Sequence, residues 1–290
     1  MKKFIQIGTG GFGRYWCQNV HPKMASTTQA EAAVDVNPDA LRNAVEFLHL
    51  PPEACYTDAR RAFSEHRADF AVIVVPPQFH EEMIDLALEH GMDILCEKPL
   101  ADTMEACCRI YGKVKKAGRK LVVTMSHRFE VEKQAVETLV KSGVYGKPNY
   151  IQSRLTLKRS RVRDVVHEDP ASLITGGLIH NLDTVRGICG CNAQTVYADC
   201  WIFENAPDHT SGTSGMVQVR MENGVRAAFE ESFANAACLN GWSDEYLRVE
   251  CAGAAIIADH KKIEIHSDLG YPHARCAQIP LPQQKYWDHC

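Results

Sequence analysis

The fold of this chain is decided by the stretch Lys3-Phe4-Ile5-Gln6-Ile7-Gly8-Thr9-Gly10-Gly11-Phe12-Gly13. Its first five residues have the apolar content of a short buried strand, and a helical pattern follows over residues 14–20. The glycines fit the pattern G-x-G-x-x-G in the strand–turn–helix setting of a dinucleotide-binding loop. They allow a tight turn, close approach of a pyrophosphate and close helix packing, and amides at the helix N-terminus face the phosphates. The residues expected to bind this group are Gly8, Gly10, Gly11, Phe12 and Gly13.

An acidic residue stands at the end of the next predicted strand, where this kind of loop requires one about 20 residues further on. Asp35 lies in the run 32–36, and we expect its carboxylate to bind the ribose hydroxyls. Its charge would repel a 2′-phosphate, so NAD is favoured over NADP. Asn37 and Pro38 predict the N-cap and first turn of a helix that runs to Leu48.

Strands and helices alternate through the first part of the chain. Apolar runs at 70–75, 92–96 and 121–125 are typical of parallel strands covered on both faces. Amphipathic helices separate them, and the last begins at a capping-box pattern from Asp102. This alternation predicts a Rossmann-type α/β domain with a doubly wound parallel sheet over residues 1–123.

The apolar run 92–96 leaves the core through Glu97-Lys98-Pro99. Proline removes a backbone donor and disfavours a helical conformation in the residue before it, so Lys98 is expected to be held extended at a strand end. In open α/β sheets, ligands bind in the crevice outside the carboxyl ends of the strands. Lys98 is therefore a candidate functional residue.

The character of the sequence changes in residues 124–290. Strands are expected at runs rich in β-branched and aromatic residues, namely 150–157, 195–203, 216–221, 225–233, 246–251 and 262–266. Glu222-Asn223-Gly224 predicts a hairpin turn. A single helix is embedded among them, around residues 178–189. We expect an α+β domain with a largely antiparallel sheet.

Composition excludes several function classes. The chain has 290 residues, 45% of them hydrophobic, and a net charge of -4, so no affinity for nucleic acid or anionic membranes is expected. No apolar run approaches the roughly 20 residues of a membrane span, and the N-terminal apolar run stops at Gly8, which favours a cytoplasmic location. The twelve cysteines include no Cys-x-x-Cys pair, so we expect reduced thiols and no metal site.

The order of short motifs resembles the glucose–fructose oxidoreductase, inositol dehydrogenase and MocA (Gfo/Idh/MocA) family over nearly the whole chain. The segments that carry the resemblance are Gly8–Gly13, Pro77-Gln-Phe-His80, Glu97-Lys98-Pro99-Leu100, His127-Arg128-Phe129, Ser142-Gly143 to Gly146-Lys147-Pro148, and Gly177-Leu-Ile-His180-Asn-Leu-Asp183.

The resemblance implies a nicotinamide-dependent oxidoreductase that acts on a secondary alcohol or ketone of a sugar, cyclitol or related polyol. It places Pro77, His80 and Glu97 near the cofactor, and Lys98 and His180 at the reacting carbon. This fits the chemistry, because histidine can accept the hydroxyl proton near neutral pH and a lysine ammonium can stabilise the alkoxide.

Three further residues are candidates for the substrate side of the site. Asp183 lies one helical turn after His180 and could orient the imidazole, hold a substrate hydroxyl, or pair with Arg186. His127 and Arg128 could line a polyol pocket or form structural pairs.

The chain departs from the family pattern in two places. Relatives carry an aspartate four residues before the histidine, where this chain has Gly176, and a carboxylate from Asp164, Glu168 or Asp169 could replace it. Relatives also continue beyond residue 290, so a truncated product and a naturally shortened member are both open. The resemblance further implies a homo-oligomer, a dimer or tetramer, formed through the open face of the second domain's sheet.

Two alternatives to an active polyol dehydrogenase stay open. One is an NAD-binding sensor or regulatory protein with impaired catalysis, which the glycine at position 176 motivates. The other is an imine or unsaturated-ring reductase in which His180 acts as an acid. The substrate is not specified by the sequence: the basic cluster Lys158-Arg159-Ser160-Arg161-Val162-Arg163 reads as a solvated loop or as a site for an anionic substrate group.

Overall fold

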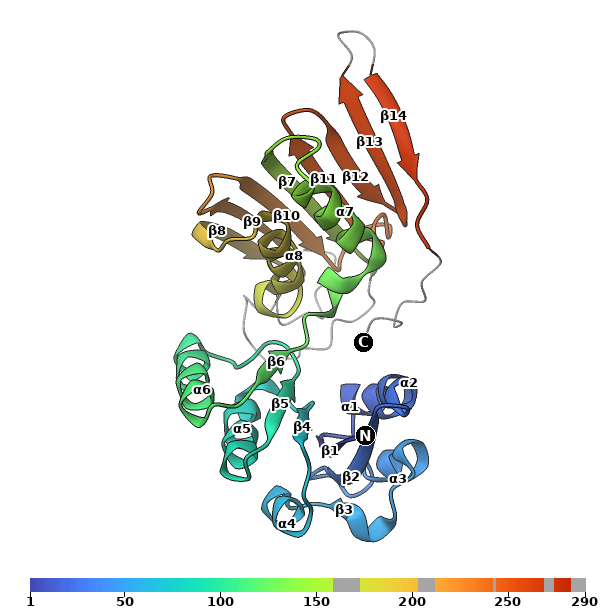
Figure 1. Ribbon diagram of the computed structural model, residues 1–290, viewed down its shortest axis with the longest axis vertical. Coiled ribbons are helices and arrows are strands. Elements are labelled where there is room, and N and C mark those ends of the chain that lie inside the picture. Colours follow the sequence, from blue (N-terminus) through green and yellow to red (C-terminus); the bar gives the residue numbers. More distant parts are fainter. Residues whose placement is uncertain (159–172, 203–211, 242–243, 269–273, 283–290) are drawn as a thin grey trace. The chain divides into compact units, whose positions relative to one another are not determined.

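The structure, a computed structural model, describes residues 1–158, 173–202, 212–241, 244–268 and 274–282. The chain divides after Thr124 into two compact units, coloured from blue to cyan-green and from green to red in Figure 1. Each unit has its own hydrophobic core, and each is described by itself below.

The N-terminal unit contains a six-stranded sheet in the order β3-β2-β1-β4-β5-β6, with every neighbouring pair parallel. The doubly wound parallel sheet is thereby confirmed. The strands are β1 (Lys2–Ile7), β2 (Thr28–Val34), β3 (Cys55–Tyr56), β4 (Phe70–Ile73), β5 (Asp93–Cys96) and β6 (Leu121–Val123). The order reverses between β1 and β4, which is where a doubly wound sheet opens a binding crevice.

Helices connect the strands of this unit. The segment after the glycine loop is one continuous helical run of α1 (Phe12–Tyr15), the π-helical η1 (Trp16–Val20) and α2 (His21–Met24). The others are α3 (Arg42–Leu48), η2 (Pro52–Ala54), α4 (Ala59–Glu65), η3 (Pro77–Phe79), α5 (His80–Glu89) and α6 (Met104–Ala117).

Two predicted helix starts are wrong by a few residues. The helix expected to open at Asn37-Pro38 begins at Arg42, because the Asn37 side chain accepts a hydrogen bond from the amide of Asp39 and closes a local turn instead. The helix expected to open at Asp102 is capped one residue later, by Thr103 Oγ1 accepting from the amide of Ala106.

The C-terminal unit is built on an eight-stranded sheet in the order β14-β13-β12-β11-β7-β10-β9-β8. Only β7 and β10 pair in parallel, so the largely antiparallel sheet is confirmed. The strands are β7 (Pro148–Thr156), β8 (Ala193–Trp201), β9 (Ser214–Met221), β10 (Arg226–Ser232), β11 (Tyr246–Cys251), β12 (Ala255–Asp259), β13 (Lys262–Asp268) and β14 (Ala274–Ile279). Of these, β12 and β14 were not predicted.

Helices cover one face of this sheet, as Figure 1 shows for α7 and α8. They are η4 (Ser126–Phe129), α7 (Val131–Lys141), the π-helical η5 (Ile174–Leu178) and α8 (Ile179–Cys189). Val136 of α7 and Val185 of α8 pack with Ile151 and Phe229 of the sheet in one buried cluster. The predicted hairpin turn joins β9 to β10, with Gly224 at φ 87°. Among the helices described, none has the length and apolar content to cross a membrane.

Candidate active site

The glycine-rich loop follows β1, and its glycines are required for different reasons. Gly8 has φ 86°, and a Cβ there would overlap the carbonyl of Val74, the residue after β4. A Cβ on Gly13 would overlap the carbonyl of Gly8, so the helix can lie against the strand end only with glycine at position 13. At Gly10 an added Cβ meets no such overlap, so neighbouring protein atoms do not require glycine there, which fits its expected role of admitting a ligand to the backbone. Gly11 also has open space around it, but its φ of 51° is one that residues with a side chain rarely adopt.

Asp35, at the end of β2, holds this loop in place. Its Oδ2 accepts hydrogen bonds from the amides of Thr9 (2.8 Å) and Gly10 (2.9 Å), and its Oδ1 accepts from the amide of Asn37 (2.9 Å). Asn43 Nδ2 donates to the carbonyl of Thr9 at 2.8 Å and fixes the loop from α3. The carboxylate that is expected to bind ribose thus also supports the phosphate loop.

His80 ties together two segments that leave the sheet. It is fully buried, with Nε2 2.8 Å from the carbonyl of Val75 and Nδ1 3.1 Å from the carbonyl of Leu100. Burial lowers the pKa of His80, although the two carbonyls oppose this shift. Both ring nitrogens face the backbone, so the side chain positions the loops after β4 and β5. Pro77, also predicted at the cofactor, is buried in η3.

Glu97 links the strand end of β5 to the helix after the glycine loop. Its Oε1 accepts from Trp16 Nε1 and its Oε2 from the amide of Lys98, both at 3.0 Å. Burial raises the pKa of Glu97. Lys98 is half-buried, and its peptide bond to Pro99 is cis. Because β1, β4 and β5 are parallel neighbours, the glycine loop, η3 and Lys98 all lie at the carboxyl edge of one sheet.

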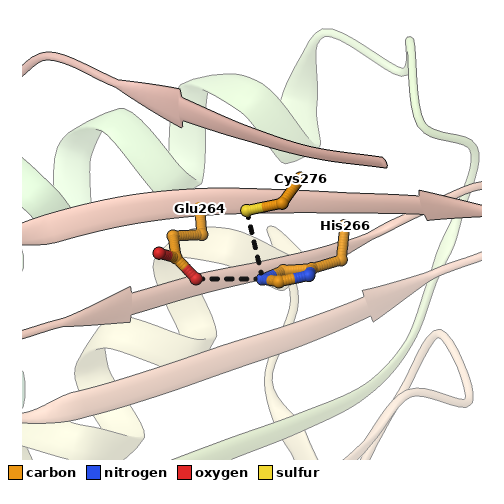
Figure 2. Close-up of side chains that lie close together, drawn as sticks. All are labelled: Glu264, His266 and Cys276. Carbon is orange, nitrogen blue, oxygen red and sulfur yellow. Dashed lines mark hydrogen bonds and ion pairs between the residues drawn. The ribbon is translucent and has the colours of Figure 1, made fainter. Parts of the chain in front are cut away.

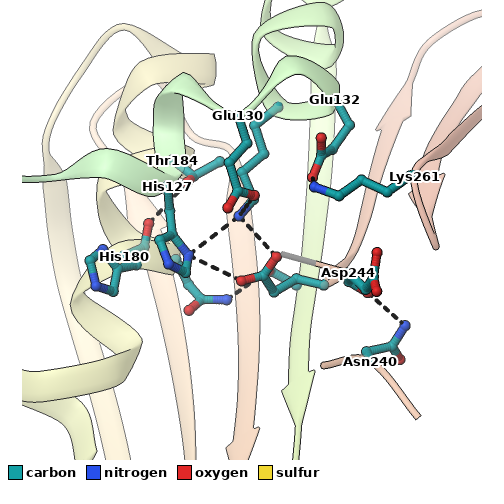
Figure 3. A network of polar contacts seen from close by, with 12 residues as sticks. His127, Glu130, Glu132, His180, Thr184, Asn240, Asp244 and Lys261 are labelled. Carbon is teal, nitrogen blue, oxygen red and sulfur yellow. Dashed lines mark hydrogen bonds and ion pairs between the residues drawn. The ribbon is translucent and has the colours of Figure 1, made fainter. Parts of the chain in front are cut away.

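In the C-terminal unit, the two predicted histidines lie against each other. His127 of η4 and His180 of α8 are both 4% exposed, and their rings stack with centroids 4.1 Å apart and planes 15° apart (Figure 3). The main chain of His180 is anchored by Thr184, whose hydroxyl donates to its carbonyl at 2.9 Å. Two separate predictions thus fall on one pair of side chains.

A buried ionic cluster, formed by Glu130, Lys133 and Glu245, supports this pair. Glu245 Oε1 lies 3.0 Å from His127 Nδ1, and its Oε2 lies 3.1 Å from Lys133 Nζ. Lys133 also lies 2.8 Å from Glu130. Burial alone would raise the pKa of Glu245, but the Lys133 charge and the His127 hydrogen bond lower it below its usual range. The contact to Glu245 sets the orientation of the His127 ring.

The ionic cluster already contains its own cation. Ligand atoms of His127, Glu130 and Glu245 lie close enough together to hold a metal ion. The ammonium of Lys133, however, lies 2.8 Å from Glu130, 3.1 Å from Glu245 and 3.5 Å from His127. A metal ion here would have to displace a buried, paired lysine, so the donor set does not fit a metal.

Asp183 pairs with Arg128 and not with its helix neighbour. Its Oδ1 accepts from Arg128 Nη1 at 3.3 Å, while Arg186 donates to Asn192. Of the three roles considered for Asp183, pairing with Arg186 is therefore wrong. Burial raises the pKa of Asp183, and Arg128 opposes the shift. Its Oδ2 is buried without a hydrogen bond from any described residue, which leaves an acceptor on this helix face.

A carboxylate that was not predicted lies one turn before His180. Glu231 of β10 is fully buried, and its carboxylate approaches Gly177 so closely that a Cβ there would overlap it. The strand pattern could have indicated this, because Glu231 alternates with its neighbours onto the same inward strand face as Ala227 and Phe229. Lys133 carried a similar signal, because it lies three residues before Val136 on the apolar face of α7.

Several predicted groups lie outside the described residues. These are Asp164, Glu168 and Asp169, considered as replacement carboxylates, and Arg159, Arg161 and Arg163 of the basic cluster. Lys158 is described and exposed, and its amide contacts Cys238 Sγ.

Comparisons with known proteins agree with the two-unit architecture. The chain is 39% identical over 271 residues to the uncharacterized protein y4oX of Sinorhizobium fredii, covering 91% of this chain and 74% of that protein. It is 29% identical over 199 residues to inositol 2-dehydrogenase of Corynebacterium glutamicum, covering 68% of this chain but only 57% of that relative. An oxidoreductase from Agrobacterium radiobacter, solved with NAD+, L-tartaric acid and magnesium, shares the fold with a TM-score of 0.84 at 20% identity, over 99% of this chain and 81% of that one.

Two family models match consecutive parts of the chain. Residues 2–125 match the oxidoreductase family with an NAD-binding Rossmann fold, and residues 134–256 match the GFO/IDH/MocA C-terminal domain. Both matches follow the division of the structure into a parallel-sheet unit and a mixed-sheet unit. The chain therefore belongs to the Gfo/Idh/MocA family of oxidoreductases.

Proposed function

We propose that this protein is an NAD-dependent dehydrogenase that moves a hydride between nicotinamide and a secondary alcohol or ketone of a sugar, cyclitol or related polyol. The observation that carries the proposal is the carboxyl edge of the N-terminal sheet, where the glycine loop, Asp35 and Lys98 follow β1, β2 and β5. Among similar proteins, one is an inositol 2-dehydrogenase, and a levoglucosan dehydrogenase was solved with NADH and levoglucosan.

The residues divide the reaction between them. Bound NAD supplies the hydride acceptor. The substrate hydroxyl must lose its proton as its carbon loses hydride, and we assign the acceptance of that proton to His180. We assign the stabilisation of the developing alkoxide to the ammonium of Lys98. In the reverse direction, His180 returns the proton to the carbonyl oxygen.

His127 and the ionic cluster act through His180. The ring of His127 is held by Glu245 and presents one face to His180, which fixes the plane of the second ring. Arg128 and Asp183 are assigned to the substrate side, where the buried Oδ2 of Asp183 can accept a hydrogen bond from a substrate hydroxyl.

Glu231 is assigned the part of the carboxylate that relatives carry four residues before the histidine. Gly177 lets this carboxylate lie against the helix one turn before His180, so a carboxylate is present at this helix although position 176 is glycine. This removes the main reason to prefer an inactive sensor. No observation on the described residues favours an imine or ring reductase.

The central test is an NAD-reduction screen over sugars, cyclitols and sugar acids, followed by Lys98→Ala. We expect the variant to lose about 100-fold or more in kcat, since aimed electrostatic groups contribute this much, while NAD affinity is retained. The matched control is Lys116→Ala, an exposed lysine of the same unit that should leave both quantities unchanged. Unchanged turnover in Lys98→Ala would refute the assigned role, and NAD binding without turnover of any compound would support the sensor.

We also propose that the protein works in the cytoplasm as a homo-oligomer, a dimer or tetramer, through its C-terminal sheet. Exposed apolar side chains on one face of β8 and β9 support this, among them Tyr197, Trp201 and Met216. Light scattering coupled to size-exclusion chromatography measures the mass, and a monomer at micromolar concentration would contradict the proposal.

A further inference from the structure

Three side chains with metal-ligating atoms meet on β13 and β14. His266 Nε2 lies 3.0 Å from Glu264 Oε2 and 3.7 Å from Cys276 Sγ (Figure 2). The sheet register explains the meeting: His266 is directly opposite Cys276, and Glu264 lies two residues before His266 on the same strand face. Ile263 and Ile265 point the other way, into the core, so the three ligands lie on the face opposite α7.

The separations match those of a tetrahedral zinc site. Bond lengths of about 2.0–2.1 Å to nitrogen and oxygen and about 2.3 Å to sulfur imply ligand–ligand separations of about 3.3 Å for N···O and about 3.5 Å for N···S. The observed separations differ from these by a few tenths of an ångström. The three ligand atoms all lie within 4.8 Å of one another, so small rotations of these partly or fully exposed side chains are enough to bind an ion.

The cluster lacks the positive charge that fills the other three-ligand group in this unit. At His127, Glu130 and Glu245, the ammonium of Lys133 occupies the centre. Within the described ranges, by contrast, the ion pair recorded for Glu264 is with His266. Among the described residues, a carboxylate, an imidazole and a thiol therefore converge without a lysine or arginine between them.

We propose that Glu264, His266 and Cys276 bind a Zn²⁺ ion, with water as the fourth ligand. This goes beyond the dehydrogenase activity and does not depend on it. A thiol with an imidazole favours zinc over magnesium or calcium, which prefer all-oxygen sites. Gln278 Nε2 donates to Glu264 Oε1 at 3.1 Å and leaves Oε2 directed at the site, which is the support that a ligating carboxylate needs.

Binding would connect the edge strand β14 covalently, through the metal, to β13. The Cys276 thiol gives up its proton as the sulfur–zinc bond forms, and no electron is transferred. One proton per ion from the thiol is therefore released to the buffer. Because the ligands come from two strands, the bound ion should also raise the thermal stability of this hairpin.

The test titrates chelator-treated full-length protein with ZnCl₂ by calorimetry and with CoCl₂ by absorbance, where a thiolate–cobalt charge-transfer band reports a sulfur ligand. We expect one ion bound at this site in the wild type and its loss in Cys276→Ser and His266→Ala. Gln278→Leu should bind about 10- to 100-fold more weakly, as for loss of a partner that orients a ligand. Cys108→Ser, which changes an exposed cysteine on α6, should bind like the wild type.

The ligand side chains are partly or fully exposed, so their replacement should leave the sheet intact. Circular dichroism of each variant checks this. Zinc binding that is equal in the wild type and in Cys276→Ser would overturn the proposal. So would a wild-type protein that binds no zinc, or a cobalt complex without the charge-transfer band. None of these outcomes bears on NAD reduction, so failure here is distinct from failure of the dehydrogenase proposal.

Discussion

Lys133→Met should strongly destabilise the C-terminal unit, because Lys133 is the cation of a buried ionic cluster. The Lys133 side chain is 6% exposed and lies 2.8 Å from Glu130 and 3.1 Å from Glu245, both of which are buried. Methionine fills the volume but leaves two carboxylates without their cation. Removing one partner of a buried ion pair costs about 3–5 kcal/mol.

That loss converts into a measurable change in melting temperature. For a domain of about 150–250 residues, 1 kcal/mol corresponds to about 2–4 °C, so the melting temperature should fall by about 6–20 °C. The matched control is Lys141→Met on the same helix, where a 51% exposed lysine pairs with Glu137. An exposed pair of this kind contributes at most about 1 kcal/mol.

The pH dependence provides a second measurement. The pKa of Glu245 is lowered in the folded state, so its ion pair stabilises the fold above the unfolded pKa of about 4.3 and this stabilisation is lost as the pH falls below that value. In Lys133→Met the unpaired carboxylates can instead be protonated. The difference between variant and wild type should therefore shrink as the pH is lowered from 7 toward about 4.3.

Urea unfolding at several pH values, together with the double variant Lys133→Met/Glu245→Gln, completes the experiment. The double variant should regain part of the lost stability, because it removes one of the stranded charges. A Lys133→Met protein that unfolds within about 1 kcal/mol of wild type at pH 7 would refute the reasoning, since that is the value of an exposed pair.

Three further predictions concern the site. Glu231→Gln should lower kcat by at least about tenfold and shift the pH profile of kcat/KM, without changing NAD affinity. The control Glu230→Gln, on the opposite strand face, should leave kcat and the pH profile unchanged. Equal effects of the two variants would argue against a role for Glu231. Gly8→Ala should abolish NAD binding, measured by calorimetry, and lower the free energy of unfolding by about 1–3 kcal/mol, measured by urea unfolding. The control Gly112→Ala, in open space on α6, should leave the stability unchanged or raise it. NAD affinity that is kept in Gly8→Ala would contradict the assignment of the loop. Asp35→Ser should lower the ratio of kcat/KM with NAD to kcat/KM with NADP by about tenfold, which corresponds to about 1.4 kcal/mol of removed repulsion. An unchanged ratio would show that Asp35 only supports the loop.

Local sequence signals predicted the strands and the glycine loop of the N-terminal unit well, because these features depend on residues that are close together in the sequence. The glycine loop, Asp35 and the buried strands each follow from a turn, a strand end or an apolar run. The wrong helix starts also have a local cause, in which a side chain hydrogen-bonds a nearby amide and delays the start of the helix. Asn37 has the residue type of an N-cap, but its side chain bonds the amide of Asp39, and the helix starts only at Arg42.

The C-terminal unit was predicted only as a class. Its strands β12 and β14 were missed, although most of their residues are apolar, because their assignment as strands depends on partners that the sheet sets. Parallel pairing of β7 with β10 joins segments about 75 residues apart, which no local pattern encodes. The register of β13 against β14 places the Glu264–His266–Cys276 group together on the open face of the sheet.

The sequence by itself determined the candidates for the chemistry: the glycine loop, Lys98, His127 and His180 are recognisable from motif and order alone. Only the tertiary structure decided their partners. Arg128 displaced the neighbouring Arg186 as the partner of Asp183, and Glu245 reached His127 from a distant segment. The physical reason is that a buried charge must be paired wherever burial places it, and burial is set by long-range packing of helices on the sheet.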